Sequence, residues 1–177
     1  MRFARPILLS IVLFIIAFKV AYGQARNSIG VGAGLNFPFK TGYSIGRDRV
    51  LQLQLFSKKQ WAFMPVLGLE NFKGKQEADM DVAFLNMAAK YYVSKTVFIY
   101  AGPSVYAGGN DNGVAGAGGA LGAGYDWTLD GFSSIEFSLR TDFLPAYTRL
   151  PPAAGIRVAY KFNFKHKDGE RNRFDIP

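Results

Sequence analysis

Residues 153–164 read AAGIRVAYKFNF, and their side chains alternate strictly in character. The even positions from Ile156 to Phe164 are apolar and end in three aromatics, whereas the cations Arg157 and Lys161 stand on odd positions. A period of two is typical of a β-strand, in which successive side chains point to opposite faces. In a soluble sheet the apolar face would cover a core. In a transmembrane barrel it would face lipid, and the cations would line the interior.

The first residues have the features of a cleaved export signal. Arg2 and Arg5 supply a basic start, residues 7–18 form an apolar run, and Gly23 completes a small-residue cleavage site. The apolar run is shorter than the ~20 residues that a membrane-spanning helix needs. We therefore expect residues 1–23 to be a signal peptide that is removed on export.

The rest of the chain has the length of one domain. We expect residues 24–164 to form a single β-barrel and residues 165–177 to be a polar periplasmic tail. The chain carries a net charge of +8. Its basic residues do not form the clustered stripe that nucleic-acid binding requires, so we expect no nucleic-acid partner.

Eight segments with alternating side chains follow the signal, separated by turn-forming residues. No stretch after residue 23 has a sustained helical period or ~20 consecutive apolar residues. The connections are short near residues 57–60, 94–96 and 128–132 and longer near residues 72–80, 107–113 and 144–152. Bacterial outer-membrane barrels alternate short periplasmic turns with longer outer loops in the same way. The predicted strands cover residues 27–37, 43–56, 61–71, 81–93, 97–106, 114–127, 133–143 and 153–164.

The chemistry of the two faces favours a membrane barrel. The apolar faces carry large side chains, whereas the opposite faces alternate glycine with charge, which suits a narrow polar interior better than a solvent-facing sheet. Aromatic residues near the segment ends match the girdles that such barrels place at the membrane interfaces. The predicted fold is all-β, an antiparallel up-and-down transmembrane barrel of about eight strands after a cleaved signal. We assign to the girdles Trp61, Tyr91, Tyr92, Tyr125, Trp127, Tyr160, Phe162 and Phe164.

The second segment contains an exception to this pattern. Arg47 and Arg49 share the parity of the apolar Leu51, Leu53 and Leu55. Either a bulge near residue 46 resets the register, or the two arginines lie beyond the apolar band.

The inward positions carry balanced charges. An eight-stranded barrel has an interior just wide enough for side chains to fill, and an unpaired buried charge is costly. The glycines of the first and sixth segments would leave space for long cationic side chains. We therefore predict an ion-pair network that fills the lumen, with the anions Glu70, Asp126, Glu136 and Asp142 and the cations Lys90, Arg140, Arg157 and Lys161.

Three stretches carry a family resemblance. GVGAGLNFP at residues 30–38, AAKYYVS at 88–94 and GIRVAYKF at 155–162 resemble the small, porin-like outer-membrane β-barrels of Gram-negative bacteria. The resemblance implies an outer-membrane location, and a terminal strand read by the barrel-assembly machinery. This chain departs from the family pattern because it continues to residue 177 after the last aromatic. The residues that correspond to the assembly signal are Gly155, Tyr160, Phe162 and Phe164.

Few residues could support catalysis or metal binding. The chain has no cysteine and a single histidine, His166, which lies in a basic run after the last segment and is expected to be a surface residue. Asp79 and Asp81 stand at a loop–strand junction and are expected to be solvated. Asp111 lies in a loop whose spacing does not match an EF-hand. We expect no catalytic residue, metal or cofactor, and no enzymatic activity.

The sequence therefore predicts a non-enzymatic outer-membrane barrel with a structural or interaction role. Its expected partners are outer-membrane lipid and the barrel-assembly machinery. The partner of the outer loops stays open, and we expect a monomer. The alternatives are an exported soluble ligand carrier of the lipocalin type and a narrow diffusion pore.

Overall fold

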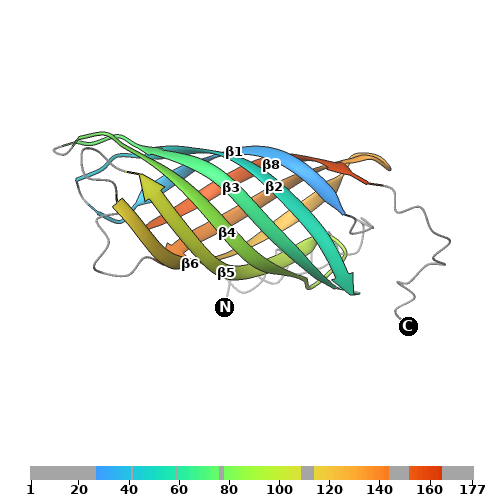
Figure 1. Cartoon of the computed structure of the whole chain (residues 1–177). Helices are drawn as coiled ribbons and strands as arrows, with labels where there is room; N and C mark the ends of the chain where they lie inside the picture. Colours follow the sequence, from blue (N-terminus) through green and yellow to red (C-terminus); the bar gives the residue numbers. More distant parts are fainter. Residues whose placement is uncertain are drawn as a thin grey trace, which may run out of the picture.

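The computed structural model describes residues 27–40, 42–58, 60–75, 78–108, 114–143 and 152–164. They form a closed antiparallel barrel of eight strands, in which each strand pairs with its sequence neighbours and β1 pairs with β8 (Figure 1). The predicted fold class is confirmed. The strands are β1 (Ser28–Pro38), β2 (Gly46–Lys58), β3 (Trp61–Phe72), β4 (Met80–Tyr92), β5 (Val97–Gly108), β6 (Val114–Thr128), β7 (Ser133–Phe143) and β8 (Ala153–Asn163).

Some predictions fall outside the described residues, namely the signal peptide at 1–23 and the tail at 165–177. The second strand begins at Gly46 rather than at residue 43, because Tyr43 makes only an isolated bridge with Gly74. Within the described ranges, no helix is both long and apolar enough to cross a membrane.

The two ends of the barrel differ in their connections. At the turn end, where β1 begins and β8 ends, residues 59–60, 93–96 and 129–132 join consecutive strands. At the loop end, the longer connections 39–45, 73–79, 109–113 and 144–152 do so. Asp130 holds one tight turn, because its Oδ1 accepts hydrogen bonds of 2.7 Å from the backbone N–H groups of Phe132 and Ser133. These bonds hold the pKa of Asp130 below its usual value.

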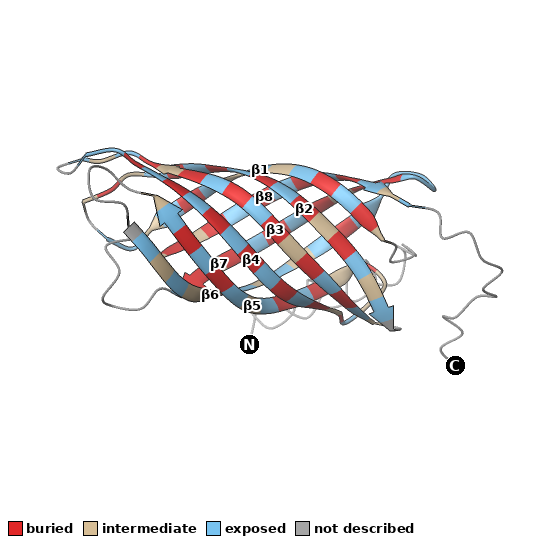
Figure 2. Cartoon of the chain, in the orientation of Figure 1, coloured by how far each residue is buried: buried red, intermediate tan, exposed pale blue. Residues whose placement is uncertain are grey.

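Burial alternates residue by residue along the strands, as the chequered pattern in Figure 2 shows. The outward side chains form a continuous apolar surface, and Leu67, Leu69 and Leu139 are 55%, 63% and 63% exposed. Soluble monomers rarely leave apolar patches of this extent uncovered. A wall of this kind, around a polar interior, is the arrangement of a transmembrane barrel.

The arginines of β2 belong to this outer surface. Pairing between β1 and β2 runs without interruption from Asn36 opposite Gly46 to Ser28 opposite Gln54, so no bulge resets the register near residue 46. The irregularity in β2 lies between Phe56 and Lys58 instead. Arg47 and Arg49 are therefore on the outer face, and both are exposed.

The interior is more aromatic than the sequence analysis expects. Phe84, Phe98, Tyr100 and Tyr106, from β4 and β5, are buried inside the barrel. Tyr92 lies there too, at 3% exposure, so its assignment to the outer girdle is wrong. Its inward position follows from the parity of β4, because Tyr92 is two residues from the inward Lys90.

Glycines provide the space for these large inward side chains. Gly122 pairs with Tyr100 and Gly124 with Phe98 across the β5–β6 ladder. A Cβ atom added at either glycine would collide with the facing ring and with a backbone carbonyl oxygen of β7. Large side chains on one strand thus pack over glycine on the next, and together they fill the narrow interior.

Replacing Gly122 by valine should destabilise the barrel by about 1–3 kcal/mol, because the new side chain overpacks against the Tyr100 ring and the Leu139 carbonyl oxygen. Thermal unfolding, followed by the shift between folded and unfolded bands in a denaturing gel, measures the effect. Gly119→Val is the matched control, since a Cβ there would meet only the carbonyl oxygen of Gly102, at 3.5 Å. Equal losses of stability in both variants would contradict the packing described for Gly122.

Candidate functional site

Charged side chains cross the interior near the turn end and form what we call the turn-side cluster: Lys90, Asp126, Glu136 and Lys161. The Lys90 ammonium lies 2.7 Å from Glu136 Oε2 and 3.3 Å from Asp126 Oδ2. Lys161 lies 3.0 Å from the same Glu136 oxygen and also pairs with Asp126. The four residues come from β4, β6, β7 and β8. These ion pairs therefore join strands on opposite sides of the lumen.

Neutral groups complete the turn-side cluster. Lys90 donates a hydrogen bond of 2.8 Å to Gln54 Oε1, and its ammonium lies 3.5 Å from the centre of the Phe98 ring. The Tyr92 hydroxyl donates to Asp126. Lys90 is 0% exposed, so its stabilisation comes from these neutral contacts together with its ion pairs to Glu136 and Asp126.

A second set, the loop-side cluster, comprises Asp48, Glu70, Arg140, Asp142 and Arg157. The Arg140 guanidinium pairs with Glu70, lies 2.9 Å from Asp142 Oδ2 and lies 3.7 Å from Asp48 Oδ2. Arg157 Nε donates a hydrogen bond of 3.0 Å to Asp48 Oδ2. Both arginines also lie over the Phe84 ring, at 4.9 and 5.7 Å.

The two clusters differ in charge balance. The turn-side cluster has two cations and two carboxylates, whereas the loop-side cluster has two arginines and three carboxylates. The Tyr106 hydroxyl lies 3.1 Å from Asp142 Oδ1 and donates to it. Ion pairs thus fill the interior at two levels.

Solved structures of known proteins share this fold. No family model matches this chain, and no curated protein matches its sequence. Among solved structures, Neisserial surface protein A (NspA) has a TM-score of 0.60 and 11% identity, over 80% of this chain and 99% of its own. Ail, the attachment invasion locus protein of Yersinia pestis, has a TM-score of 0.52 and 15% identity, over 80% and 99%. The N-terminal β-barrel domain of OprF from Pseudomonas aeruginosa has a TM-score of 0.50 and 15% identity, over 78% and 100%.

This chain has the fold of a small outer-membrane β-barrel. At these identities the similarity concerns the fold. The exposed apolar wall agrees with it, because a barrel that spans a membrane turns its apolar side chains outward. The buried charges accordingly occupy the interior of a barrel with this fold.

All eight charged residues named from the sequence lie on the inner face of the barrel. They fall into two separate groups rather than one network. Sequence reasoning missed Asp48, which holds both arginines of the loop-side cluster. Asp48 occupies an even position of β2, as do the inward Gln52 and Gln54. Extending this alternation towards residue 46 would have placed Asp48 inside the barrel. Tyr92 and Tyr106 were missed as well, because no local signal distinguishes an inward tyrosine from a girdle tyrosine.

The four residues of the expected assembly signal lie in or directly after β8, where it pairs with β1 to close the barrel. Gly155 faces inward next to the Asn36 side-chain oxygen. Tyr160 and Phe162 are on the outer face, and their rings meet edge to face at 4.9 Å. Phe164 follows β8 directly, and its N–H donates a hydrogen bond of 2.7 Å to the Asn27 carbonyl oxygen.

The other candidate residues lie at the loop end or outside the described residues. Asp79 Oδ1 accepts a hydrogen bond of 2.9 Å from the Gly74 N–H. Asp81 Oδ1 accepts one of 2.6 Å from Asn71 Nδ2. Both bonds are exposed and organise the loop between β3 and β4. His166 and Asp111 are among the residues not described. No metal-binding group of three or more His, Cys, Asp or Glu occurs within the described ranges.

Proposed function

We propose that this protein is a non-conducting, non-enzymatic outer-membrane barrel with a structural or interaction role. The observation that carries the proposal is the pair of ion-paired clusters that fill the interior at two levels. Lys90 and Glu136, whose ion pair joins β4 to β7, are both almost fully buried. An ion that crossed the barrel would have to separate such pairs, at a large cost in free energy.

The two alternative functions fit the interior less well. A lipocalin-type carrier holds its ligand in a cavity of the barrel interior, whereas ion pairs and aromatic rings occupy this one. A diffusion pore needs a water-filled channel, which barrels of 16 or more strands provide. The proposal that the protein is not an enzyme rests on the absence of cysteine and the presence of a single histidine, in the C-terminal tail.

We further propose its partners from the outer surface. The apolar wall contacts the lipid of the outer membrane. The barrel-assembly machinery would read the β8 residues Gly155, Tyr160, Phe162 and Phe164. The protein would act as a monomer and present its longer connections outside the cell, where an external partner would bind.

Conductance in planar bilayers tests the closed interior. Pure wild-type protein should produce no large, steady single-channel currents, because side chains occupy the space that ions would need. A general porin inserted into the same bilayers serves as the positive control. Folded protein is verified by its shifted band in an unheated gel. Steady currents from folded wild-type protein would contradict the proposal and favour the pore.

A further inference from the structure

The outer wall carries two cations that the interior does not use. Arg47 and Arg49 stand two residues apart on the outer face of β2, close to the loop end. Their cross-strand neighbours on this face include Leu35 and Leu69, both exposed. Neither arginine forms an ion pair within the described part of the chain. Two charged groups on a lipid-facing surface are costly unless an anion meets them there.

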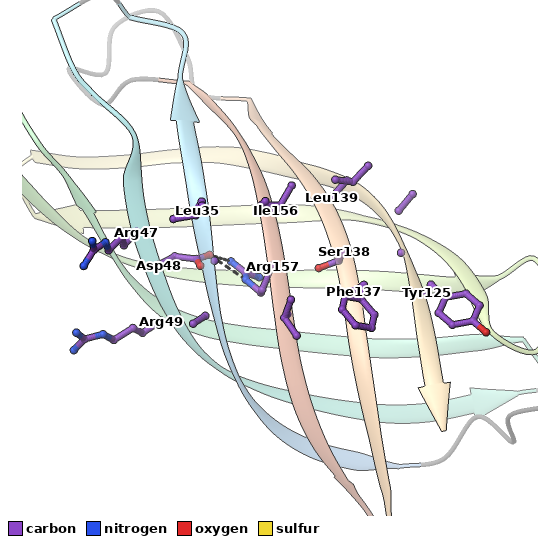
Figure 3. A pocket seen from close by; sticks show the side chains of 15 residues that line it. Leu35, Arg47, Asp48, Arg49, Tyr125, Phe137, Ser138, Leu139, Ile156 and Arg157 are labelled. Carbon is purple, nitrogen blue, oxygen red and sulfur yellow. Dashed lines mark hydrogen bonds and ion pairs between the residues drawn. The ribbon is translucent and has the colours of Figure 1, made fainter. Parts of the chain in front are cut away.

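These arginines flank the beginning of a groove on the outer wall. The groove has a volume of about 860 Å³ and crosses β2, β1, β8, β7 and β6 (Figure 3). Its floor is the backbone of one continuous row of paired residues: Asp48, Gly34, Arg157, Ser138 and Gly124.

Apolar side chains form both walls of the groove. Arg47 begins one wall and Arg49 begins the other. The side chains that follow Arg47 include Leu35, Ile156 and Leu139, and those that follow Arg49 include Val158, Phe137 and Tyr125. The groove is therefore cationic at one end and apolar along its length.

The direction of the groove relates it to the membrane. Asp48 is the third residue of β2 from the loop end, whereas Gly124 is the fifth from the turn end of β6. The groove thus descends obliquely from the loop end towards the turn end. Four strand spacings make it ~19 Å long. That length takes it well into an apolar band ~25 Å tall.

We propose that the groove holds one acyl chain of a phosphorylated lipid of the outer leaflet whose headgroup carries a net negative charge, with the lipid phosphate bound between Arg47 and Arg49. Guanidinium groups bind phosphate oxygens in a bidentate way, and two residues on one face of a strand stand ~7 Å apart, close enough to share one phosphate group. Below the phosphate, the acyl chain would lie between the apolar walls. The inference rests on the proposed outer-membrane function, because it requires the loop end to face the outer leaflet.

Tryptophan quenching by brominated lipids tests the site. Phe137→Trp, in a protein that also carries Trp61→Phe and Trp127→Phe, places a single reporter on the groove wall. The barrel is reconstituted into vesicles of phosphatidylcholine with phosphatidylglycerol, and one or the other lipid carries brominated chains. Because two arginines attract the anionic headgroup, the relative affinity of the site next to the reporter, obtained from quenching by each brominated lipid, should favour phosphatidylglycerol over phosphatidylcholine roughly tenfold.

Three further variants of the reporter protein separate binding in the groove from general attraction of anionic lipid to the protein surface. Arg47→Gln with Arg49→Gln should bring the preference close to one. Lys73→Gln with Lys75→Gln removes the same charge from the exposed loop after β3 and should leave the preference unchanged. Ala33→Phe fills the groove between Arg49 and Val158 and should abolish the preference while both arginines remain.

Several results would overturn the proposal. One is quenching of the reporter tryptophan to the same extent by brominated phosphatidylglycerol and brominated phosphatidylcholine. Another is an equal loss of the phosphatidylglycerol preference in the lysine double variant and the arginine double variant. The third is a phosphatidylglycerol preference that survives Ala33→Phe. An unheated gel verifies that each variant is folded. Failure of the proposed function has different signs. The wild-type protein would then be missing from isolated outer membranes or would conduct ions in planar bilayers, and neither result depends on the quenching measurement.

Discussion

Replacing Glu136 by glutamine should destabilise the barrel by about 3–5 kcal/mol. Glu136 is 2% exposed and accepts hydrogen bonds from both Lys90 and Lys161. Without its charge, Asp126 alone would face two buried ammonium groups. Water cannot compensate for the loss, because aromatic rings and neighbouring strands surround the cluster. The free energy of unfolding, from urea titration of the refolded barrel in lipid vesicles, measures the effect.

A double variant shows whether uncompensated charge is the cause. Adding Lys90→Met to Glu136→Gln leaves Lys161 paired with Asp126, so part of the lost stability should return. Asp81→Asn is the matched control, because Asp81 is a carboxylate on the exposed surface at the loop end and should cost well under about 1 kcal/mol. If Glu136→Gln cost no more than Asp81→Asn, the turn-side cluster would not hold the barrel together.

Arginine in place of Leu139 should destabilise the protein in a bilayer by about 2–4 kcal/mol. Leu139 is 63% exposed and lies in the middle of β7, where the strand of a membrane barrel contacts lipid. Phe143→Arg is the matched control, because Phe143 is 55% exposed on the same face of the same strand but at its loop end. Arginine near the interface should cost only about 0–1 kcal/mol.

This comparison also discriminates the membrane barrel from the soluble carrier. In water, an exposed leucine replaced by arginine changes stability by about 0.5 kcal/mol or less. Unfolding of both variants in lipid vesicles gives the two values directly. Equal effects at positions 139 and 143 would mean that depth in a bilayer does not matter, and the lipid-facing assignment of β7 would be wrong.

The sequence by itself determined the strands and their two faces. The alternation in residues 153–164 specifies a strand with one apolar and one charged face, and β7 has the predicted bounds, residues 133–143. The number of strands and the unequal connections also follow from local patterns. This succeeds because the two-residue period of a strand is a property of neighbouring residues and needs no distant contact.

Only the tertiary structure decided which side chains meet. Glu136 and Lys90 are 46 residues apart, and their contact depends on the curvature and register of the closed barrel. From the sequence, a possible bulge left open which face of β2 the arginines Arg47 and Arg49 occupy. The uninterrupted pairing between β1 and β2 places Asp48 inside the barrel and both arginines outside. The groove on the outer wall likewise exists only because five strands align Gly34, Ser138 and Gly124 in one row. Alternation within a strand assigns a residue to a face, whereas its neighbours on that face depend on strands distant in the sequence.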